Sequence, residues 1–514
     1  MNSKYSEANK SQSLLFKIAL FGFIGFALFI AGALTAATPV FAAKLLLIPL
    51  LLITIAMAFL SQTDKPLSDG FLKVWLAILL GTMALWPTYM IIKIGEFPAI
   101  DARRIVAGLS LAAMFFFLIS RKDIYRSLFK ENIGPLRTGS LLVTAYAIWR
   151  IASCFVSPSP IESLVQVFWE ILYYYSMFFV GALFFSRPSL HGWVMTVFMV
   201  LAILISGYAG IEWIMKKNIL LQFIPSGKDF ADFQAALTLS RLRDGFFRSQ
   251  STFEHPLLLA EFSAMAVCFG LAAMLWTNKS LAFRVLGTIT LIGAIAAAFL
   301  SGSRSALVTV AAGGSMVSML WFFSPKQQIT SGKSALRKLS FIMTLIAALA
   351  IALPAVTLLS QGKSKSEVTS TAARVQMLKL GIPSIEQYPL LGTGPGTGGM
   401  VAGILTGSGV RTLDNYFLAI AIESGVPAIL LLLACLIYPM WVIFNRLING
   451  TPHLPQYFAA ILGCLIVTTL THTVLWMPYN MFFTFILSGA ALAAFSNTSR
   501  NDSKYPPPTS TISS

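Results

Sequence analysis

The sequence predicts an all-α polytopic membrane protein, and composition carries most of this prediction. Hydrophobic residues occupy 56% of the 514 positions and charged residues only 11%. The mean hydropathy is +0.77. An ordinary soluble protein carries roughly 25% charged residues. These values exclude a cytosolic globular enzyme.

The order of apolar runs predicts the individual helices. A membrane-spanning helix needs ~20 mainly apolar residues. About 14 runs come close to this length, which predicts about 14 transmembrane helices. They lie at 14–36, 40–60, 71–92, 105–120, 139–156, 163–185, 192–215, 256–276, 284–300, 305–323, 339–359, 424–444, 456–473 and 480–495.

The distribution of basic residues predicts the orientation of these helices. The net charge is +17, and cytoplasmic loops of membrane proteins collect Lys and Arg. Loops 121–138 and 324–338 are both rich in Lys and Arg. An even number of spans places both on one side and puts both termini in the cytoplasm. The first run is too long for the apolar region of a signal peptide.

The same pattern divides the chain into six regions. We predict an N-terminal bundle of about seven helices and two long extracytoplasmic loops, which flank a central group of helices. C-terminal helices and a Ser- and Pro-rich disordered cytoplasmic tail follow. In chain order these regions are 1–215, 216–255, 256–359, 360–423, 424–495 and 496–514.

Several arginines on the predicted outer side depart from the positive-inside rule. Arg248 lies in the first long loop, Arg304 in a short turn, and Arg374 and Arg411 in the second long loop. One explanation is that long loops cross the membrane largely regardless of charge. The other is a group of arginines that binds a phosphorylated ligand, because guanidinium binds phosphate oxygens in bidentate fashion.

Arg150 and Glu170 both lie inside predicted spans. Arg150 and Glu170 are each about seven residues from the outer ends of adjacent helices, so both lie roughly 10 Å deep at 1.5 Å per residue. Isolated charges at that depth are costly. We expect the two side chains to form an ion pair, with a polar lining of a lipid-carrier groove as the alternative.

Four short segments of the outer loops form an ordered set. They are 248–256 (RSQSTFEHP), 301–306 (SGSRSA), 388–396 (YPLLGTGPG) and 412–417 (TLDNYF), with Arg374 before the third and Glu423-Ser424-Gly425 after the last. Over roughly residues 240–440 this set resembles the O-antigen ligase and Wzy-type polysaccharide polymerase family. By itself the glycine-rich segment is best interpreted as a tight turn, since it follows no predicted strand.

The resemblance implies a GT-C-like fold and a metal-independent, inverting glycosyl transfer without a cofactor. The donor would be an oligosaccharide linked through pyrophosphate to a polyprenol. Ligases of the family usually carry a His-Asn pair where this chain has Asp414-Asn415. The departure favours a polymerase of exopolysaccharide or O-antigen repeats over a ligase that modifies lipid A core.

Roles for the site residues follow from this chemistry. Arg248, Arg304 and Arg374 would neutralise the pyrophosphate, and Asp414 and Glu423 would orient or deprotonate the acceptor hydroxyl. His255, Asn415 and Arg411 are further possible site residues. Each has a structural alternative. The arginines are also typical of solvated or headgroup-binding charges, and Glu423 of a buried acceptor. Asp414 is typical of the cap of a helix over 415–423, and His255 of the cap at a helix start.

The sequence therefore predicts a polysaccharide polymerase in the bacterial inner membrane, acting at the periplasmic face. Its predicted partners are the lipid-linked oligosaccharide, membrane lipids and a chain-length regulator protein, without nucleic acid. A ligase and a polyprenyl-linked oligosaccharide flippase remain alternatives. A flippase should bury its cations near the membrane midplane, whereas these arginines concentrate in outer loops.

Overall fold

The computed structural model describes residues 67–87, 90, 101–120, 134–223, 242–243, 245–276, 280–323, 365–405, 411–449 and 454–502. The helices predicted at 14–36, 40–60 and 339–359 lie outside these residues, as do much of the first long loop and the end of the C-terminal tail.

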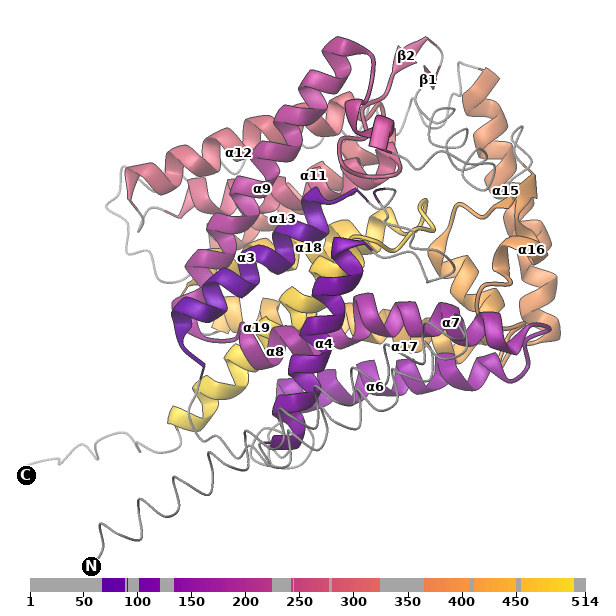
Figure 1. The fold of residues 1–514 in the computed structure, drawn as a ribbon, viewed down its shortest axis with the longest axis horizontal. Helices are drawn as coiled ribbons and strands as arrows, with labels where there is room; N and C mark the ends of the chain where they lie inside the picture. The colour runs from indigo at the N-terminus through magenta and orange to yellow at the C-terminus, as the bar shows by residue number, and fades with distance from the viewer. Residues whose placement is uncertain are drawn as a thin grey trace, which may run out of the picture.

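The other eleven predicted runs each coincide with helical residues (Figure 1). The N-terminal helices are α3 (Asp69–Leu85), α4 (Ala102–Ser120), α6 (Pro135–Cys154), α7 (Pro160–Glu170), α8 (Ser176–Phe184) and α9 (Pro188–Met215). The later ones are α11 (Pro256–Leu275), α12 (Leu281–Leu300), α13 (Arg304–Phe323), α17 (Tyr416–Asn449), α18 (Pro455–Thr471) and α19 (Met481–Asp502). A π-helical turn, η1 (Ile171–Tyr175), joins α7 to α8.

Six of the described helices are long and apolar enough to cross a membrane. They are Pro160–Phe184, α9, α11, α12, α13 and α17, and α18 and α19 are shorter apolar helices. The chain is thus a helical, multi-pass membrane protein. The total of about 14 spans stays a prediction, because part of the chain lies outside the described residues.

The centre of the bundle is α11, which packs against α9, α12, α13 and α18. Small residues permit these contacts. A Cβ on Gly270 of α11 would lie 2.8 Å from the carbonyl oxygen of Gly287 on α12. Close backbone approach at small residues is the usual way in which membrane helices associate, so these glycines fix the distance between the two helices.

The second predicted loop, 360–423, is largely folded. It contains the 23-residue helix α15 (Lys365–Gln387), the short α16 (Gly398–Ala402) and the first two turns of α17. Two-residue strands β3 (Ile404–Leu405) and β4 (Arg411–Thr412) pair antiparallel, as do β1 (Leu242–Arg243) and β2 (Phe246–Phe247) in the first loop.

A small apolar core holds this region together. It consists of Met377, Ala402, Leu413, Leu418, Ala419 and Ile422, and is separate from the main core of the bundle. Figure 1 shows α15 and α16 at the end of the molecule where α6, α7 and α17 terminate or begin. The segment that carries Arg374 and Asp414 is thus built on a folded support.

Candidate functional site

Arg150 lies at the centre of a buried ionic network. Its side chain on α6 is fully buried, and its Nε donates to Oε2 of Glu170 on α7 over 3.0 Å. A second contact joins Nη2 of Arg150 to Oε1 of the same carboxylate. The hydroxyl of Tyr175 also donates to Glu170 Oε2, at 2.5 Å. The ion pair expected from the depths of the two residues is confirmed.

Glu423 is a second carboxylate in this network. The sequence predicted it as a site residue but did not predict its contact with Arg150. Nη1 of Arg150 donates to Oε2 of Glu423 over 3.0 Å and to the hydroxyl of Ser424 over 2.8 Å. A bridge between α6, α7 and α17 results. Since Glu423 is 273 positions from Arg150 in the chain, no local spacing could have indicated the contact.

A kink in α17 brings Glu423 to Arg150. Gly425 has φ 75° and ψ −178°, outside the helical region. Its Cβ would lie 2.1 Å from the carbonyl oxygen of Leu390, so only glycine fits. Pro427 follows and has no N–H, which leaves the Glu423 carbonyl without its helical donor.

The glycine-rich turn supplies the donors that the kink removes. The N–H groups of Thr393 and Gly394 donate to the carbonyls of Ile422 and Glu423, both over 2.9 Å. The N–H of Val426 donates in return to the Pro389 carbonyl at 2.8 Å. The tight turn predicted at 392–396 is confirmed, with Gly392, Gly394 and Gly396 all at positive φ. Its place on α17 shows that it supports the kink.

The side chain of Glu423 is bound from two directions. Arg150 donates to Oε2, and the N–H of Gly398, the first residue of α16, lies 3.3 Å from Oε1. This arrangement matches the buried acceptor given above as the alternative for Glu423. Its contacts fit a positioning residue that holds α16 and the glycine-rich turn against α6.

Arg248 and Arg304 meet at the turn between α12 and α13. Nε of Arg248, a side chain that is 7% exposed, donates to the Ser301 carbonyl over 2.9 Å. Gly302 has φ 59°, and a Cβ there would lie 2.8 Å from Cγ of Arg248. Arg304 is the first residue of α13, where the helix dipole attracts anions. Two of the three predicted pyrophosphate ligands therefore belong to one local structure.

His255 is the N-cap of α11, in agreement with its structural alternative. Its Nδ1 accepts from the N–H of Leu257 over 3.1 Å. Burial, together with the nearby charge of Arg248, lowers the pKa of His255 to about 3. The imidazole is therefore neutral at physiological pH and available as a hydrogen-bonding group only.

Asp414 does not cap α17, so the capping alternative for this residue is wrong. Asn415 has that role, because its Oδ1 accepts from the N–H of Leu418 over 3.0 Å. No hydrogen bond from the part of the chain that the structure describes reaches the carboxylate of Asp414. Burial raises the pKa of Asp414, and the charge of Arg374 offsets part of this rise.

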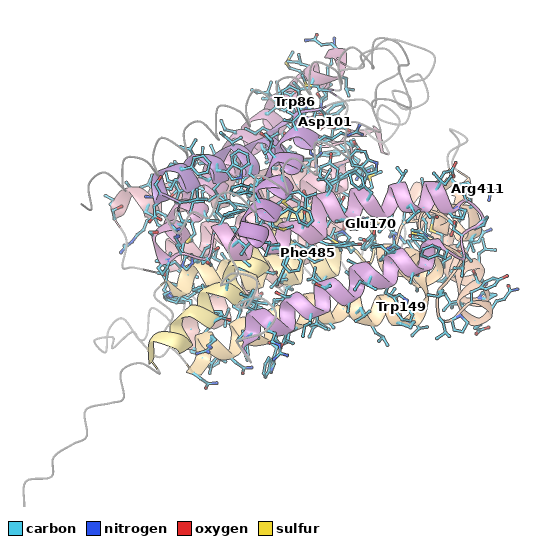
Figure 2. All side chains as sticks on the ribbon, turned by 60° about the horizontal axis from the view of Figure 1, so that its bottom comes forward. Trp86, Asp101, Trp149, Glu170, Arg411 and Phe485 are labelled. Atoms are coloured by element: carbon cyan, nitrogen blue, oxygen red, sulfur yellow. The ribbon has the colours of Figure 1, made fainter. Side chains whose placement is uncertain are left out.

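Arg374 is a positive charge that acts on Asp414. It lies on α15 and is half-buried, and its Nε has no hydrogen-bond partner among the described residues. Arg411 lies differently. It is exposed, its Nη1 donates to the Met400 carbonyl over 2.9 Å, and Figure 2 shows it at an outer end of the molecule. Arg374 thus acts on Asp414 through its charge, whereas Arg411 is engaged by the Met400 carbonyl.

Comparison with known proteins finds a similarity to one family. A family model described as O-Antigen ligase matches residues 289–433. This segment is similar to that family, and it is called the O-antigen ligase domain for that reason. The resemblance read from the four segments is thereby confirmed, and a function of O-antigen ligase or polymerase type is supported. A search of curated proteins finds no match.

The O-antigen ligase domain contains only part of the site. Arg304, Arg374, Asp414, Asn415 and Glu423 lie within the matched residues. Arg248 and His255 precede the match, as do Arg150 and Glu170. The first half of the chain therefore contributes the central arginine that holds the Glu423 carboxylate of the domain.

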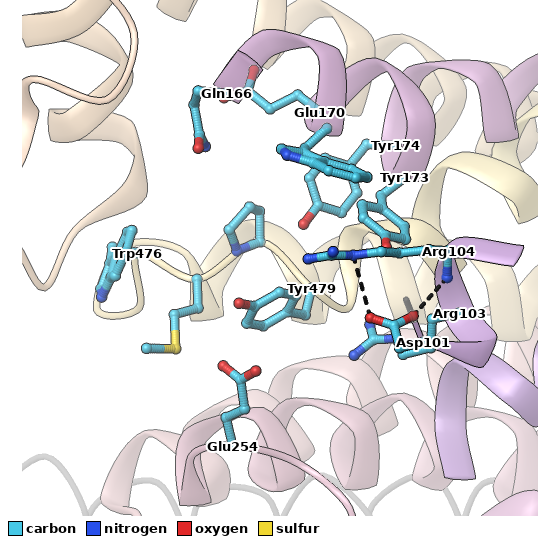
Figure 3. A pocket seen from close by; sticks show the side chains of 13 residues that line it. Asp101, Arg103, Arg104, Gln166, Glu170, Tyr173, Tyr174, Glu254, Trp476 and Tyr479 are labelled. Atoms are coloured by element: carbon cyan, nitrogen blue, oxygen red, sulfur yellow. Dashed lines mark hydrogen bonds and ion pairs between the residues drawn. The ribbon is translucent and has the colours of Figure 1, made fainter. Parts of the chain in front are cut away.

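A cavity of about 290 Å³ lies beside this network and was missed by sequence reasoning (Figure 3). Its walls come from the start of α4, from α7 and η1, from Glu254 and from residues 476–479. All of them lie outside the O-antigen ligase domain. One sequence feature could have indicated this cavity. The pair Arg103-Arg104 lies just before an apolar run, on the predicted outer side of the membrane.

Proposed function

We propose that the chain is a polysaccharide polymerase. In this proposal it transfers an oligosaccharide from polyprenyl pyrophosphate to a glycan acceptor at the periplasmic face of the bacterial inner membrane. The acceptor hydroxyl attacks the anomeric carbon with inversion, the bond from that carbon to the phosphate oxygen breaks, and polyprenyl pyrophosphate leaves. Asp414 takes the proton of the hydroxyl.

The observation that carries the proposal is the state of Asp414. Its carboxylate accepts no hydrogen bond from the described residues, yet it is half-buried and its pKa responds to the charge of Arg374. A carboxylate free to accept a proton is what a general base requires. Burial raises its pKa, which makes it a better acceptor than an exposed aspartate.

Arginines near the site support the handling of the leaving group. Arg374 has an unpartnered Nε among the described residues, and Arg304 begins a helix whose N-terminus favours anions. Guanidinium groups keep their charge and match phosphate oxygens geometrically. Because pyrophosphate is already a good leaving group, charge neutralisation suffices and the proposal needs no metal ion or cofactor.

Two features favour polymerisation over the alternatives. Asp414 stands where ligases of the family usually have histidine, which argues against transfer to lipid A core. The cavity lies at helix ends, with Arg103 in the first turn of α4 and Glu254 just before α11. A flippase would need its cations near the midplane. We also propose that both termini are cytoplasmic and that a chain-length regulator protein binds the chain.

Reconstitution with a defined donor tests this function. Purified protein in lipid nanodiscs receives a polyprenyl-pyrophosphate-linked repeat unit, and the products are separated by length on a gel. We expect a ladder of products that differ by one repeat. A single transfer that occurs only when lipid A core is added would instead identify a ligase. Movement of the donor across a vesicle membrane without a new glycosidic bond would identify a flippase.

A further inference from the structure

The cavity beside Glu170 contains more charged groups than its own structure requires. Asp101, Arg103, Arg104, Glu170 and Glu254 all line it. Buried charges are normally paired, so each of them needs a partner. Groups that lack one indicate what else the cavity binds.

Three of the five groups are engaged by neighbours. Asp101 accepts from the N–H of Arg104 over 2.7 Å, and Nε of Arg104 lies 3.4 Å from the same carboxylate. The guanidinium of Arg104 also stacks on Trp169, with Cζ 4.6 Å from the ring centre. Glu170 is bound by Arg150 and Tyr175. These contacts account for the charges of Asp101, Arg104 and Glu170.

Arg103 and Glu254 are the remaining two. Arg103 is only 9% exposed, and its Nε has no hydrogen-bond partner among the described residues. Its Cζ lies 5.5 Å from the ring centre of Tyr479. Glu254 interacts with the hydroxyl of Tyr479, and burial raises the pKa of Glu254 to about 7. Figure 3 shows Arg103 and Glu254 flanking Tyr479 on the side of the open cavity.

A guanidinium donor left unpartnered in a buried site is destabilising unless a ligand satisfies it. Arg103 can donate hydrogen bonds into the cavity, and the carboxyl group of Glu254 can accept them. A ligand with vicinal hydroxyls matches this pair, because hydroxyl groups both donate and accept. Trp169 is covered by Arg104 and stacks on Tyr173. Trp476, which is 41% exposed, offers a flat apolar face to the C–H face of a ring.

Size and charge exclude other ligands for this space. The volume of about 290 Å³ lies at the lower end of the range for ligand pockets, ~300–1,000 Å³. That is too small for a polyprenyl chain. Three carboxyl groups and two guanidinium groups line the space, so no excess of positive charge favours a pyrophosphate or a sugar carboxylate there.

We infer that this cavity is a binding subsite for one uncharged sugar ring of the glycan acceptor, with hydroxyls bound between Arg103 and Glu254 and the ring against Trp476. The inference rests on the proposed function in naming the acceptor as the source of the ring. Glu170 connects the subsite to the O-antigen ligase domain, because it lines the cavity and binds Arg150, which holds Glu423.

Glycan binding by the full-length protein tests the subsite without requiring transfer. Protein in nanodiscs is applied to an array of defined neutral and uronate-containing oligosaccharides, and Kd is measured for those retained. We expect neutral oligosaccharides to bind. Arg103→Gln removes the guanidinium and should raise Kd by about tenfold or more. Trp476→Ala removes an aromatic side chain from the cavity lining and should also raise Kd. Because Trp476 is 41% exposed, the substitution should not affect folding.

Arg187→Gln is the matched control, since Arg187 is half-exposed and pairs with Asp69 away from the cavity. It should leave Kd unchanged. The inference is overturned if no glycan binds, if only uronate-containing glycans bind, or if both cavity variants bind like the wild type. Neutral glycan binding without polymer formation would contradict the proposed function and leave the subsite standing. Polymer formation by the wild type, with glycan binding unaltered in both cavity variants, would contradict the subsite and leave the proposed function standing.

Discussion

Asp414 and Glu423 are two carboxylates of the same domain, nine positions apart, and their surroundings are opposite. Glu423 is bound by Arg150 at one oxygen and by the N–H of Gly398 at the other. Asp414 accepts no hydrogen bond from the described residues and has only the charge of Arg374 nearby. Sequence reasoning gave both residues the same catalytic role.

The difference separates positioning from reaction. A carboxylate whose oxygens are occupied holds structure, and one whose oxygens are free can accept a proton. The same distinction applies to the buried arginines. Arg150 has three side-chain partners, whereas Arg103 keeps a donor without one among the described residues. Variants of the two sets should therefore change different measurements.

The largest effect is expected at Asp414. Asp414→Asn keeps the shape but removes the base, so turnover should fall by about 10²–10⁴-fold, the usual contribution of general acid–base catalysis. Melting temperature should stay unchanged because Asn415 caps α17. In the wild type, turnover should decline on acidification at a pH above the ordinary aspartate pKa of 3.8, because burial raises that pKa.

Glu423→Gln is the companion variant for this comparison. Gln can still accept from Arg150, so turnover should fall less than in Asp414→Asn while the melting temperature decreases. Gel assays of product length and thermal unfolding of the same preparations measure both. Equal losses of turnover at unchanged stability would remove the distinction between the two carboxylates.

Arg150→Met should mainly affect folding. Loss of the guanidinium leaves Glu170 and Glu423 buried without a counter-charge, which costs about 3–5 kcal/mol. Arg187→Met is the matched control. Its ion pair with Asp69 spans 2.5 Å but is 34% and 41% exposed, so its loss should change stability little. Thermal unfolding in detergent compares them, and equal stability of the two variants would refute a structural role for the Arg150 network.

Arg304 tests the anion site. Arg304→Ala should reduce turnover by roughly 10²–10³-fold, the effect of removing one group that stabilises developing charge. Arg304→Lys keeps the charge but loses the bidentate geometry, so its loss should be smaller. Turnover is measured at equal amounts of folded protein. Full activity of the alanine variant would show that Arg304 only contacts lipid headgroups.

The smallest effect is expected at Asn415. Asn415→Ala removes the cap and should lower stability by about 1 kcal/mol, with turnover per folded molecule nearly intact. Thermal unfolding and the turnover assay check the two parts. If Asp414→Asn lowers stability and Asn415→Ala does not, Asp414 rather than Asn415 caps α17.

The sequence predicted what depends on local pattern. Runs of apolar residues located the helices, and depth within adjacent spans predicted the pairing of Arg150 with Glu170. The third partner, Glu423, required the kink at Gly425, which helical periodicity does not report. The cavity brings together residues from 101 to 479, and no spacing reveals such a set.

The N-cap of α17 shows a second limit of prediction from the sequence. Asp and Asn cap helices about equally well, so adjacent Asp414 and Asn415 could not be told apart by residue type. Only the position of the Leu418 N–H relative to Asn415 decides. Similarly, the basic charge of the loops indicated an anion site, but the packing of Arg248 on Gly302 required the fold.

The central claim is that the transfer site faces the outside of the inner membrane, and cysteine labelling tests it most directly. Met400 is 63% exposed on α16, beside Arg411, and the four native cysteines are buried. Met400→Cys should react with an impermeant maleimide in intact spheroplasts. Ser189→Cys, exposed near Arg187 on the predicted cytoplasmic side, should react only after lysis. The opposite pattern, with Met400→Cys protected until lysis, would contradict the account.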